Sequence, residues 1–339
     1  MRMRINMSIL LAALSICGTF VASPVMAQIK PEVKPEIKFK VAWQEKLDVK
    51  VASNPSTFCV GDLKGDGKQR LAMIDSNDGE SFSMWKYTMI ICSFVDGKFK
   101  LDWQSDPFTS MYRQSLRIVP EAGMPAHICY AGEKTRLWQY DAKKDIYASK
   151  LASDSLKITD VIVKEQPYVV FSQGYSPIIK KGEDFDKWVD GAKKAPYVTW
   201  VQTIGDVDLD GKDEVAAIID GGNVGIYTLD SKEKSISATT YGNNQNRITL
   251  WYVKDQKTPY IVVNKNYEKG SREEIKYDFS KISLLKYDGK EYVEVWSSDE
   301  IKDIIVDMQV CDPKTEGTLG LVALSTNDAG CMLTKIVAE

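Results

Sequence analysis

The chain has 339 residues, of which 44% are hydrophobic and 27% charged, so it can bury a sizeable core in one large or two medium domains. Its formal net charge of −3 at pH 7 disfavours nucleic acid or an anionic membrane surface as a partner. The only histidine, His127, nearly excludes histidine-based zinc sites and Ser-His-Asp triads, so catalysis is the less favoured expectation.

Residues 1–27 have the pattern of a secretory signal peptide. Two arginines precede an apolar run, and a small-residue cleavage pattern ends at Ala27. Cys17 follows the bulky Ile16, which disfavours a lipoprotein attachment site. The sequence therefore predicts a secreted or periplasmic protein whose signal peptide is cleaved after Ala27.

The mature chain is expected to have no transmembrane span, because no later stretch reaches the roughly 18 apolar residues that a span needs. Residues 28–37 are rich in Pro, Lys and Glu and are expected to form an extended spacer. No later linker divides the chain, so residues 38–339 are expected to form a single domain.

Five cysteines follow the expected cleavage point, each in an apolar, strand-like stretch: Cys59, Cys92, Cys129, Cys311 and Cys331. An odd number leaves at least one of them unpaired in an oxidising compartment. Buried free thiols are the favoured interpretation. A disulfide between Cys311 and Cys331, or between Cys59 and Cys92, stays open because pairing cannot be deduced from sequence.

The domain begins with a predicted strand at residues 39–45, which has no partner strand before it. A unit of strand, acidic loop and strand then recurs along the chain. Three copies lie at residues 58–74, 205–219 and 310–324, and weaker relatives lie at 118–130, 161–171 and 251–263.

The copy at residues 205–219 has the spacing of a calcium site. Its oxygen donors alternate along the loop, with the Lys212 carbonyl among them: Asp206, Asp208, Asp210, Lys212 and Glu214. Gly211 allows the sharp turn that brings them together. Carboxylates this close repel one another, and a divalent cation removes the repulsion. An EF-hand is disfavoured because Ala217 occupies its twelfth position and both flanks have the pattern of strands.

Hairpins with an Asp at the turn recur between alternating strands, at residues 96–98, 141–143, 230–232 and 288–290. Each unit therefore has four antiparallel strands, and six such units account for residues 58–339. Radially arranged four-stranded sheets make a β-propeller, so the sequence predicts an all-β propeller of about six blades, with seven possible.

The predicted ring closes through its two ends. The last unit, from Val306 to Val337, has three strands, and residues 39–45 match its missing outer strand. The N-terminal strand is therefore expected to complete the last blade, which removes two exposed sheet edges.

The segment at residues 205–219 resembles the FG-GAP, or VCBS, repeat of integrin α-subunit propellers and of many secreted bacterial proteins. This resemblance implies a propeller fold for most of the mature chain. It also implies a calcium ion whose ligands are Asp206, Asp208, Asp210, Glu214 and the Lys212 carbonyl.

The other two copies depart from the repeat at ligand positions. Lys64 and Arg70 occupy such positions in the first copy, and Lys314 and Gly320 do so in the last. A cation placed among carboxylates replaces the metal internally. The sequence therefore predicts one calcium ion rather than three.

Long connections between the second and third strands are predicted at residues 75–87, 172–188 and 264–280. They should share the face opposite the acidic loops and carry the candidate binding residues Trp85, Tyr87, Tyr175, Trp188, Tyr267 and Tyr277. Aromatic rings with polar neighbours suit protein or glycan recognition. Rings that pack only against their own loops are the alternative.

These patterns favour a secreted, calcium-stabilised propeller that binds a protein or a polysaccharide at the cell surface or in the periplasm. A carbohydrate-active lyase or hydrolase on the same scaffold is a second hypothesis, although no pair of carboxylates stands out. A non-catalytic structural component of the cell envelope is a third.

Overall fold

The computed structural model describes residues 37–47, 55–77, 85–110, 115–121, 124–131, 135–150, 156–162, 168–173, 176–181, 193–194, 202–219, 222–228, 233–241, 247–254, 256, 258–269, 276–288, 290–327 and 330–339. The chain divides into two compact units, Met1–Ile37 and Lys38–Glu339. The predicted signal peptide and spacer lie outside the described residues, apart from Ile37.

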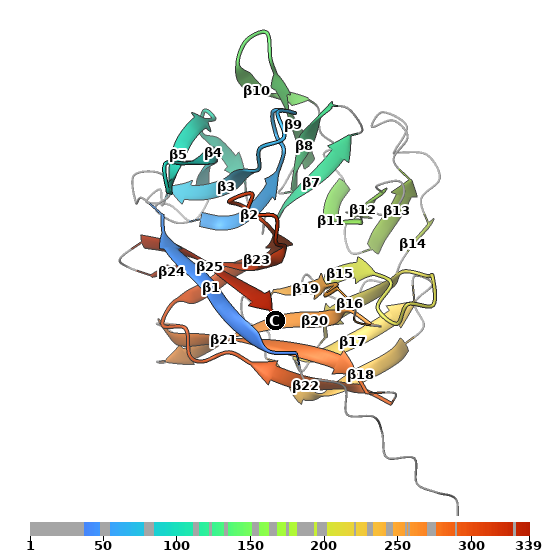
Figure 1. The fold of residues 1–339 in the computed structure, drawn as a ribbon. Helices are drawn as coiled ribbons and strands as arrows, with labels where there is room; N and C mark the ends of the chain where they lie inside the picture. The colour runs from blue at the N-terminus through green and yellow to red at the C-terminus, as the bar shows by residue number, and fades with distance from the viewer. Residues whose placement is uncertain are drawn as a thin grey trace, which may run out of the picture. The chain divides into compact units, whose positions relative to one another are not determined.

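The described residues form strands and no helix, and the strands build antiparallel sheets (Figure 1). The first sheet contains β2 (Pro55–Gly61), β3 (Arg70–Asn77), β4 (Trp85–Val95) and β5 (Lys98–Gln104), with β6 (Phe108–Ser110) beside β4. The second contains β7 (Ser115–Glu121), β8 (Met124–Ala131), β9 (Thr135–Asp141) and β10 (Ile146–Lys150). The third contains β11 (Leu156–Ile162), β12 (Tyr168–Gln173), β13 (Ser176–Lys181) and β14 (Lys193–Lys194).

Three more sheets follow among the described residues. The fourth contains β15 (Gln202–Gly205), β16 (Glu214–Ile218), β17 (Asn223–Thr228) and β18 (Glu233–Thr240). The fifth contains β19 (Ile248–Trp251), β20 (Tyr260–Lys269), β21 (Lys276–Tyr287) and β22 (Tyr292–Ser297). The sixth contains β23 (Ile304–Cys311), β24 (Gly320–Asn327), β25 (Gly330–Ala338) and β1 (Phe39–Lys46). The prediction of an all-β chain of four-stranded antiparallel sheets is confirmed.

The sixth sheet joins the two ends of the domain. Strand β1 pairs antiparallel with β25, from Phe39 opposite Ala338 to Lys46 opposite Met332. In Figure 1 the blue β1 runs beside the red β25. The N-terminal strand is therefore the outermost strand of the last sheet, in the position that the sequence predicts for it.

The first strands of the sheets lie against one another. Strand β2 contacts β7 and β23, β11 contacts β7 and β15, and β19 contacts β15 and β23. Apolar side chains of adjacent sheets belong to common buried clusters. Leu71 and Val322 share one cluster, as do Ile74 and Ile128, Ala216 and Ile261, and Val262 and Leu321. The core therefore lies between the faces of neighbouring sheets, and all five residues of β16 are buried.

Two glycines at the ends of first strands are needed for this packing. A Cβ on Gly205 would lie 2.6 Å from Leu250 Cδ1 of the next sheet, and one on Gly61 would lie 3.1 Å from Ile118. Both glycines immediately precede the first Asp of an acidic loop. In each Gly-Asp pair, the glycine allows the neighbouring sheet to approach closely, and the aspartate begins the acidic loop.

Two of the three predicted long connections are wrong. Strands β20 and β21 extend to Lys269 and from Lys276, so most of residues 264–280 form a hairpin rather than a loop. Strands β12 and β13 are separated by residues 174–175 alone. In the β20–β21 hairpin, buried polar residues such as Asn266 and Ser280 interrupt the hydrophobic alternation that marks a strand, although the backbone pairing persists.

The five cysteines after residue 27 are buried and free, which confirms the favoured interpretation. Burial raises the pKa of Cys92 to about 12 and that of Cys331 to about 11, so both thiols stay protonated at neutral pH. Within the described residues, no helix is long and apolar enough to span a membrane.

Candidate functional site: the acidic loops

The three acidic loops share one backbone conformation. We call residues 62–69, 206–213 and 312–319 the first, second and third loop. The fourth and sixth positions of each loop have positive φ: Gly65 and Gly67 at 72° and 79°, Leu209 and Gly211 at 60° and 86°, and Thr315 and Gly317 at 58° and 80°. A leucine or a threonine adopts this conformation only at a cost, so the surrounding loop must impose it.

The first Asp of each loop stabilises this conformation. Its carboxylate accepts a hydrogen bond from the amide of the glycine at the sixth position. The distances are 2.8 Å from Gly67 to Asp62, 3.0 Å from Gly211 to Asp206 and 2.6 Å from Gly317 to Asp312. The shared dihedral angles and shared hydrogen bond support the three segments as copies of one repeat.

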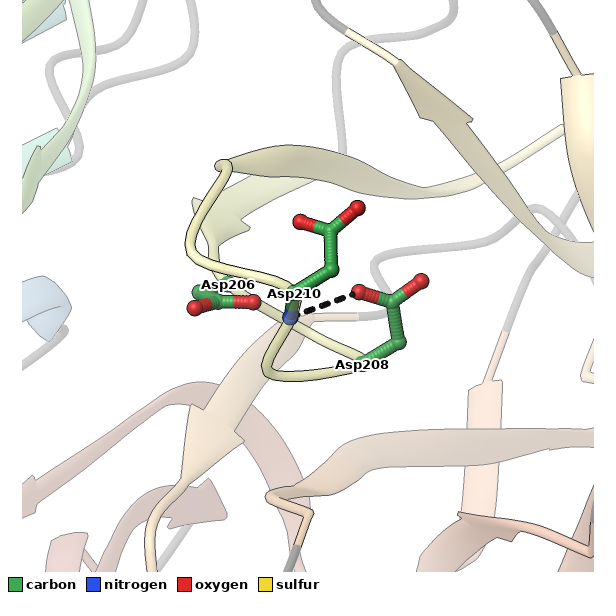
Figure 2. Close-up of side chains that lie close together, drawn as sticks. All are labelled: Asp206, Asp208 and Asp210. Carbon is green, nitrogen blue, oxygen red and sulfur yellow. Dashed lines mark hydrogen bonds between the residues drawn. The ribbon is translucent and has the colours of Figure 1, made fainter.

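The second loop brings three of the predicted ligands together. Asp206, Asp208 and Asp210 each offer one carboxylate oxygen, and these three oxygens lie within 4.8 Å of one another. Figure 2 shows all three side chains on the loop, with the Asp210 amide donating to Asp208 Oδ1 over 3.3 Å. The Lys212 amide donates to Asp210 Oδ1 over 2.8 Å, and this bond is the main reason that the pKa of Asp210 is lowered.

The donor set of the second loop fits a hard divalent cation. Asp206 Oδ1 is buried and has no hydrogen-bond partner among the described residues. A buried carboxylate oxygen without a partner is costly, and a cation bound beside it would remove that cost. Oxygen donors from a turning chain are the ligands that calcium prefers.

Glu214 is held apart from that group. It is 1% exposed, and its Oε2 accepts a hydrogen bond from the Val207 amide over 3.0 Å. Its Oε1 accepts from Lys234 Nζ over 2.8 Å. Burial raises the pKa of Glu214, whereas the bonds from Lys234 and Val207 oppose that rise.

Lys234 lies among the carboxylates, and sequence reasoning missed it. Its Nζ is 2.8 Å from Asp208 Oδ2 and 3.6 Å from Asp210 Oδ2, in addition to the bond with Glu214. Burial lowers the pKa of Lys234, but the bonds to Asp208 and Glu214 outweigh it and the net shift is upward. The ammonium therefore stays charged and neutralises part of the acidic loop.

The first loop also contains an internal cation, as its sequence predicts. Arg70 binds Asp66 through two nitrogens, over 2.7 and 2.6 Å, and its Nε lies 3.3 Å from Asp102. Lys64 instead points to Asp145 at 3.1 Å and lies over the ring of Tyr140. Of the two residues predicted to act as internal cations in the first loop, Arg70 does so and Lys64 does not.

The third loop has an internal cation from a different residue than predicted. Lys335 of β25 is 1% exposed and places its Nζ 2.8 Å from Asp312 and 2.9 Å from Glu316. A Cβ at Gly320 would lie 2.6 Å from the Ile336 carbonyl oxygen and 3.1 Å from Lys335 Cε, so this glycine makes room for both the backbone of β25 and its lysine. Lys314 points away from the loop to Glu45 at 2.7 Å.

The candidate binding residues lie in different environments, and two of them fall outside the described residues. Tyr87 is 3% exposed and packs in the core between the first two sheets, so its assignment to the binding face is wrong; β4 begins earlier than expected, at Trp85. Tyr175 and Trp188 lie outside the described residues. Tyr267 and Tyr277 lie on the β20–β21 hairpin, where Tyr267 stacks on Phe279 with ring centroids 4.3 Å apart.

No protein-family model matches the chain, and no curated protein matches it. Among solved structures, BBS1N in complex with ARL6DN is similar at a TM-score of 0.45 and 10% identity, covering 88% of this chain and 96% of that one. Trypanosoma rangeli sialidase has a TM-score of 0.46 at 9% identity, covering 89% and 59% of the two chains. The V. cholerae biofilm matrix protein Bap1 has a TM-score of 0.37 at 13% identity, covering 79% and 43%. These likenesses assign neither a family nor a function to the chain.

Proposed function

We propose that this protein is a secreted, six-bladed β-propeller of the FG-GAP type that holds one calcium ion in its second loop and acts as a binding module. The sheet order supports the blade count, because six sheets among the described residues contact one another in a closed cycle through their first strands. The pairing of β1 with β25 supports closure of the ring by the N-terminal strand.

The convergence of Asp206, Asp208 and Asp210 around a buried, unpartnered oxygen carries the calcium assignment. When bound, calcium neutralises these carboxylates and crosslinks the loop, which is a structural role. Asp206 and Asp210 also fix the loop backbone through the Gly211 and Lys212 amides. The ion would stabilise the blade rather than take part in chemistry.

The ligand-binding face is proposed on the side opposite the acidic loops. The β20–β21 hairpin supports this placement, because Lys265 and Lys281 flank its Tyr267–Phe279 stack at 5.0 and 5.7 Å from the rings. Flat rings beside ammonium groups suit a polysaccharide or a protein surface that carries carboxylates. Trp85, Tyr175, Trp188 and Tyr277 complete the proposed face.

A melting experiment tests the calcium assignment. The melting temperature of the full mature chain is compared in chelator and in millimolar calcium. Binding to the native state alone stabilises by about 2.7 kcal/mol at a hundredfold excess over the dissociation constant. We expect the melting temperature to rise in the wild type and to stay unchanged in an Asp208→Ala, Asp210→Ala variant. An equal rise in both proteins would contradict the assignment.

Binding screens test the proposed face. Glycan arrays and pull-downs are run with the wild type and with Trp85→Ala, Trp188→Ala and Tyr267→Ala variants. We expect each substitution to weaken binding at least tenfold, because each removes an aromatic contact. A Trp296→Ala variant is the control, since Trp296 is partly buried and packs against Phe39 beside a core cluster. Unchanged binding in all three test variants would place the ligand elsewhere.

A further inference from the structure

We infer that Lys234 is a built-in competitor of the metal ion in the second loop, so that its ammonium and a divalent cation occupy the carboxylate cluster in turn. This inference rests on the proposed calcium site and specifies how that site is regulated. Its basis is that Lys234 shares two predicted ligands, Asp208 and Glu214, with the ion.

The geometry makes the two cations mutually exclusive. Lys234 Nζ lies 2.8 Å from Asp208 Oδ2 and 2.8 Å from Glu214 Oε1, which is direct hydrogen-bond contact. A calcium ion coordinated by the same carboxylates at about 2.3–2.6 Å would lie within a few Å of the ammonium. Like charges at that separation repel strongly where the surroundings are partly buried. Calcium binding therefore requires Lys234 to leave.

Lys234 can leave because its side chain is 29% exposed and comes from β18, the outermost strand of its sheet. The third loop provides the contrast. Lys335 is 1% exposed and lies on β25, which is paired on both sides by β24 and β1. A lysine held in this way has no path to solvent, so the third loop is permanently neutralised by its own residue.

The first loop is closed to metal for a different reason. Arg70 occupies the position that corresponds to Glu214 and binds Asp66 with two hydrogen bonds. A guanidinium held by two such bonds replaces both a ligand and the ion. Of the three loops, the second alone combines converging aspartates with a cation that can exchange.

Exchange of this kind gives the loop two stable states. Without calcium, Lys234 neutralises Asp208 and the buried Glu214, so the loop keeps its conformation in chelator. With calcium, Lys234 moves into solvent and the ion takes over the carboxylates. Displacing Lys234 costs free energy, so the wild type should bind calcium more weakly than the same carboxylates would bind it without Lys234.

Calcium titration of matched variants tests the inference. Chelator-treated wild type, Lys234→Gln and Lys254→Gln are titrated with calcium chloride by calorimetry. Lys254→Gln is the control because it removes the same charge from an exposed side chain outside the acidic loops. We expect Lys234→Gln to bind calcium at least tenfold more tightly than the wild type, and Lys254→Gln to change the affinity less than threefold.

Lys234→Arg, which keeps the charge, should bind no more tightly than the wild type. If Lys234→Gln unfolds in chelator, its melting temperature across a calcium series replaces calorimetry, and a larger rise than in the wild type supports the inference.

Binding by Lys234→Gln alone would support Lys234 as the competitor while refuting calcium occupancy of the wild type. Equal affinities of the wild type and Lys234→Gln would overturn the inference and leave the calcium site standing. No binding by either would overturn both.

Discussion

At the scale of single residues, the three acidic loops share one turn although different residues occupy their corresponding positions. Each loop needs positive charge close to its carboxylates, and each receives it from a different element. Arg70 begins β3, Lys234 lies on β18 and Lys335 lies on β25. The conserved part of the geometry is therefore the backbone turn and its first Asp, while the source of the cation varies.

The pair of Asp66 and Arg70 should make stability depend on pH in the acid range. The hydrogen bonds from Arg70 are the main reason that the pKa of Asp66 lies far below its usual value. A carboxyl with a depressed folded-state pKa stabilises the protein fully above its unfolded pKa of about 3.9, and this contribution is lost as the pH falls towards the folded value. We therefore expect Asp66→Asn to cost about 1 kcal/mol at pH 7, a figure discounted because the Asp66 side chain is 42% exposed.

Urea unfolding of the wild type and Asp66→Asn at pH 7 and pH 2.5 measures this effect. The difference between the two proteins should shrink at the lower pH, because the wild-type carboxyl becomes protonated in the unfolded chain. Asp96→Asn is the control, since Asp96 pairs with Lys100 on an exposed hairpin turn and should give no measurable difference. A cost for Asp66→Asn that is equal at both pH values would show that the charge of Asp66 is not the cause.

The sequence was informative about the carboxylates of these loops and not about two of their cations. Local spacing identifies Asp206, Asp208 and Asp210, because the donors and the glycine turn lie within one short segment. Lys234 comes from a strand whose register with β17 shifts between Ile226 and Tyr227, and no local pattern encodes such a shift. Lys335 likewise reaches its loop only through the pairing of β24 with β25.

At the scale of elements, the third loop fastens the N-terminal strand. Lys314 pairs with Glu45 of β1 at 2.7 Å and lies 4.0 Å from the ring centroid of Trp43. The Trp43 indole donates to Glu316 Oε2 over 3.3 Å. A segment that resembles a metal loop therefore acts as a contact surface for β1, with Lys314 directed outward and Lys335 directed inward.

Replacing Lys314 should loosen β1 selectively. Lys314→Met removes a half-buried ion pair and a cation–π contact, and we expect a loss of about 1–3 kcal/mol. Lys40→Met on the same strand is the matched control, because Lys40 and Glu339 are 55% and 47% exposed and such pairs contribute about 0–1 kcal/mol. Hydrogen exchange of residues 39–46 should accelerate in Lys314→Met and not in Lys40→Met. Equal protection of β1 in both variants would refute the fastening role.

The strands themselves were predictable where apolar alternation is strong, as in β16 and β24, and less so beyond the core. The β20–β21 hairpin continues through Asn266, Tyr267 and Ser280, whose mixed polarity resembles a loop. Buried hydrogen bonds explain why these residues form strands: Ser280 donates to Asn266 over 2.5 Å and Asn266 donates to the Ile305 carbonyl over 3.1 Å. Tertiary pairing thus outweighs local pattern here.

At the scale of the whole domain, the repeat of units along the sequence predicts the sheets, and the arrangement of β1 explains how the two ends meet. Phe39 packs among Trp251, Tyr260 and Trp296 of the fifth sheet, with ring centroids 5.3 to 5.6 Å apart. Leu47, at the other end of the strand, is 2% exposed and packs in the core shared with the first sheet. The strand therefore contributes to the packing on both sides of the last sheet.

Deleting residues 38–48 should make the protein insoluble rather than mildly less stable. The deletion removes Phe39, Trp43 and Leu47, and burial of such side chains is worth about 1.5–3 kcal/mol each, against a total stability of about 5–15 kcal/mol for a typical domain. It also leaves β25 as an open edge with unpaired backbone groups, which promotes association between chains. Deleting residues 28–37 is the control and should leave solubility and melting unchanged, because the compact unit that contains all the sheets begins at Lys38. Soluble expression of the longer deletion with a wild-type melting profile would show that the domain folds without β1. Aggregation of that variant alone would tie the stability of the whole domain to one terminal strand.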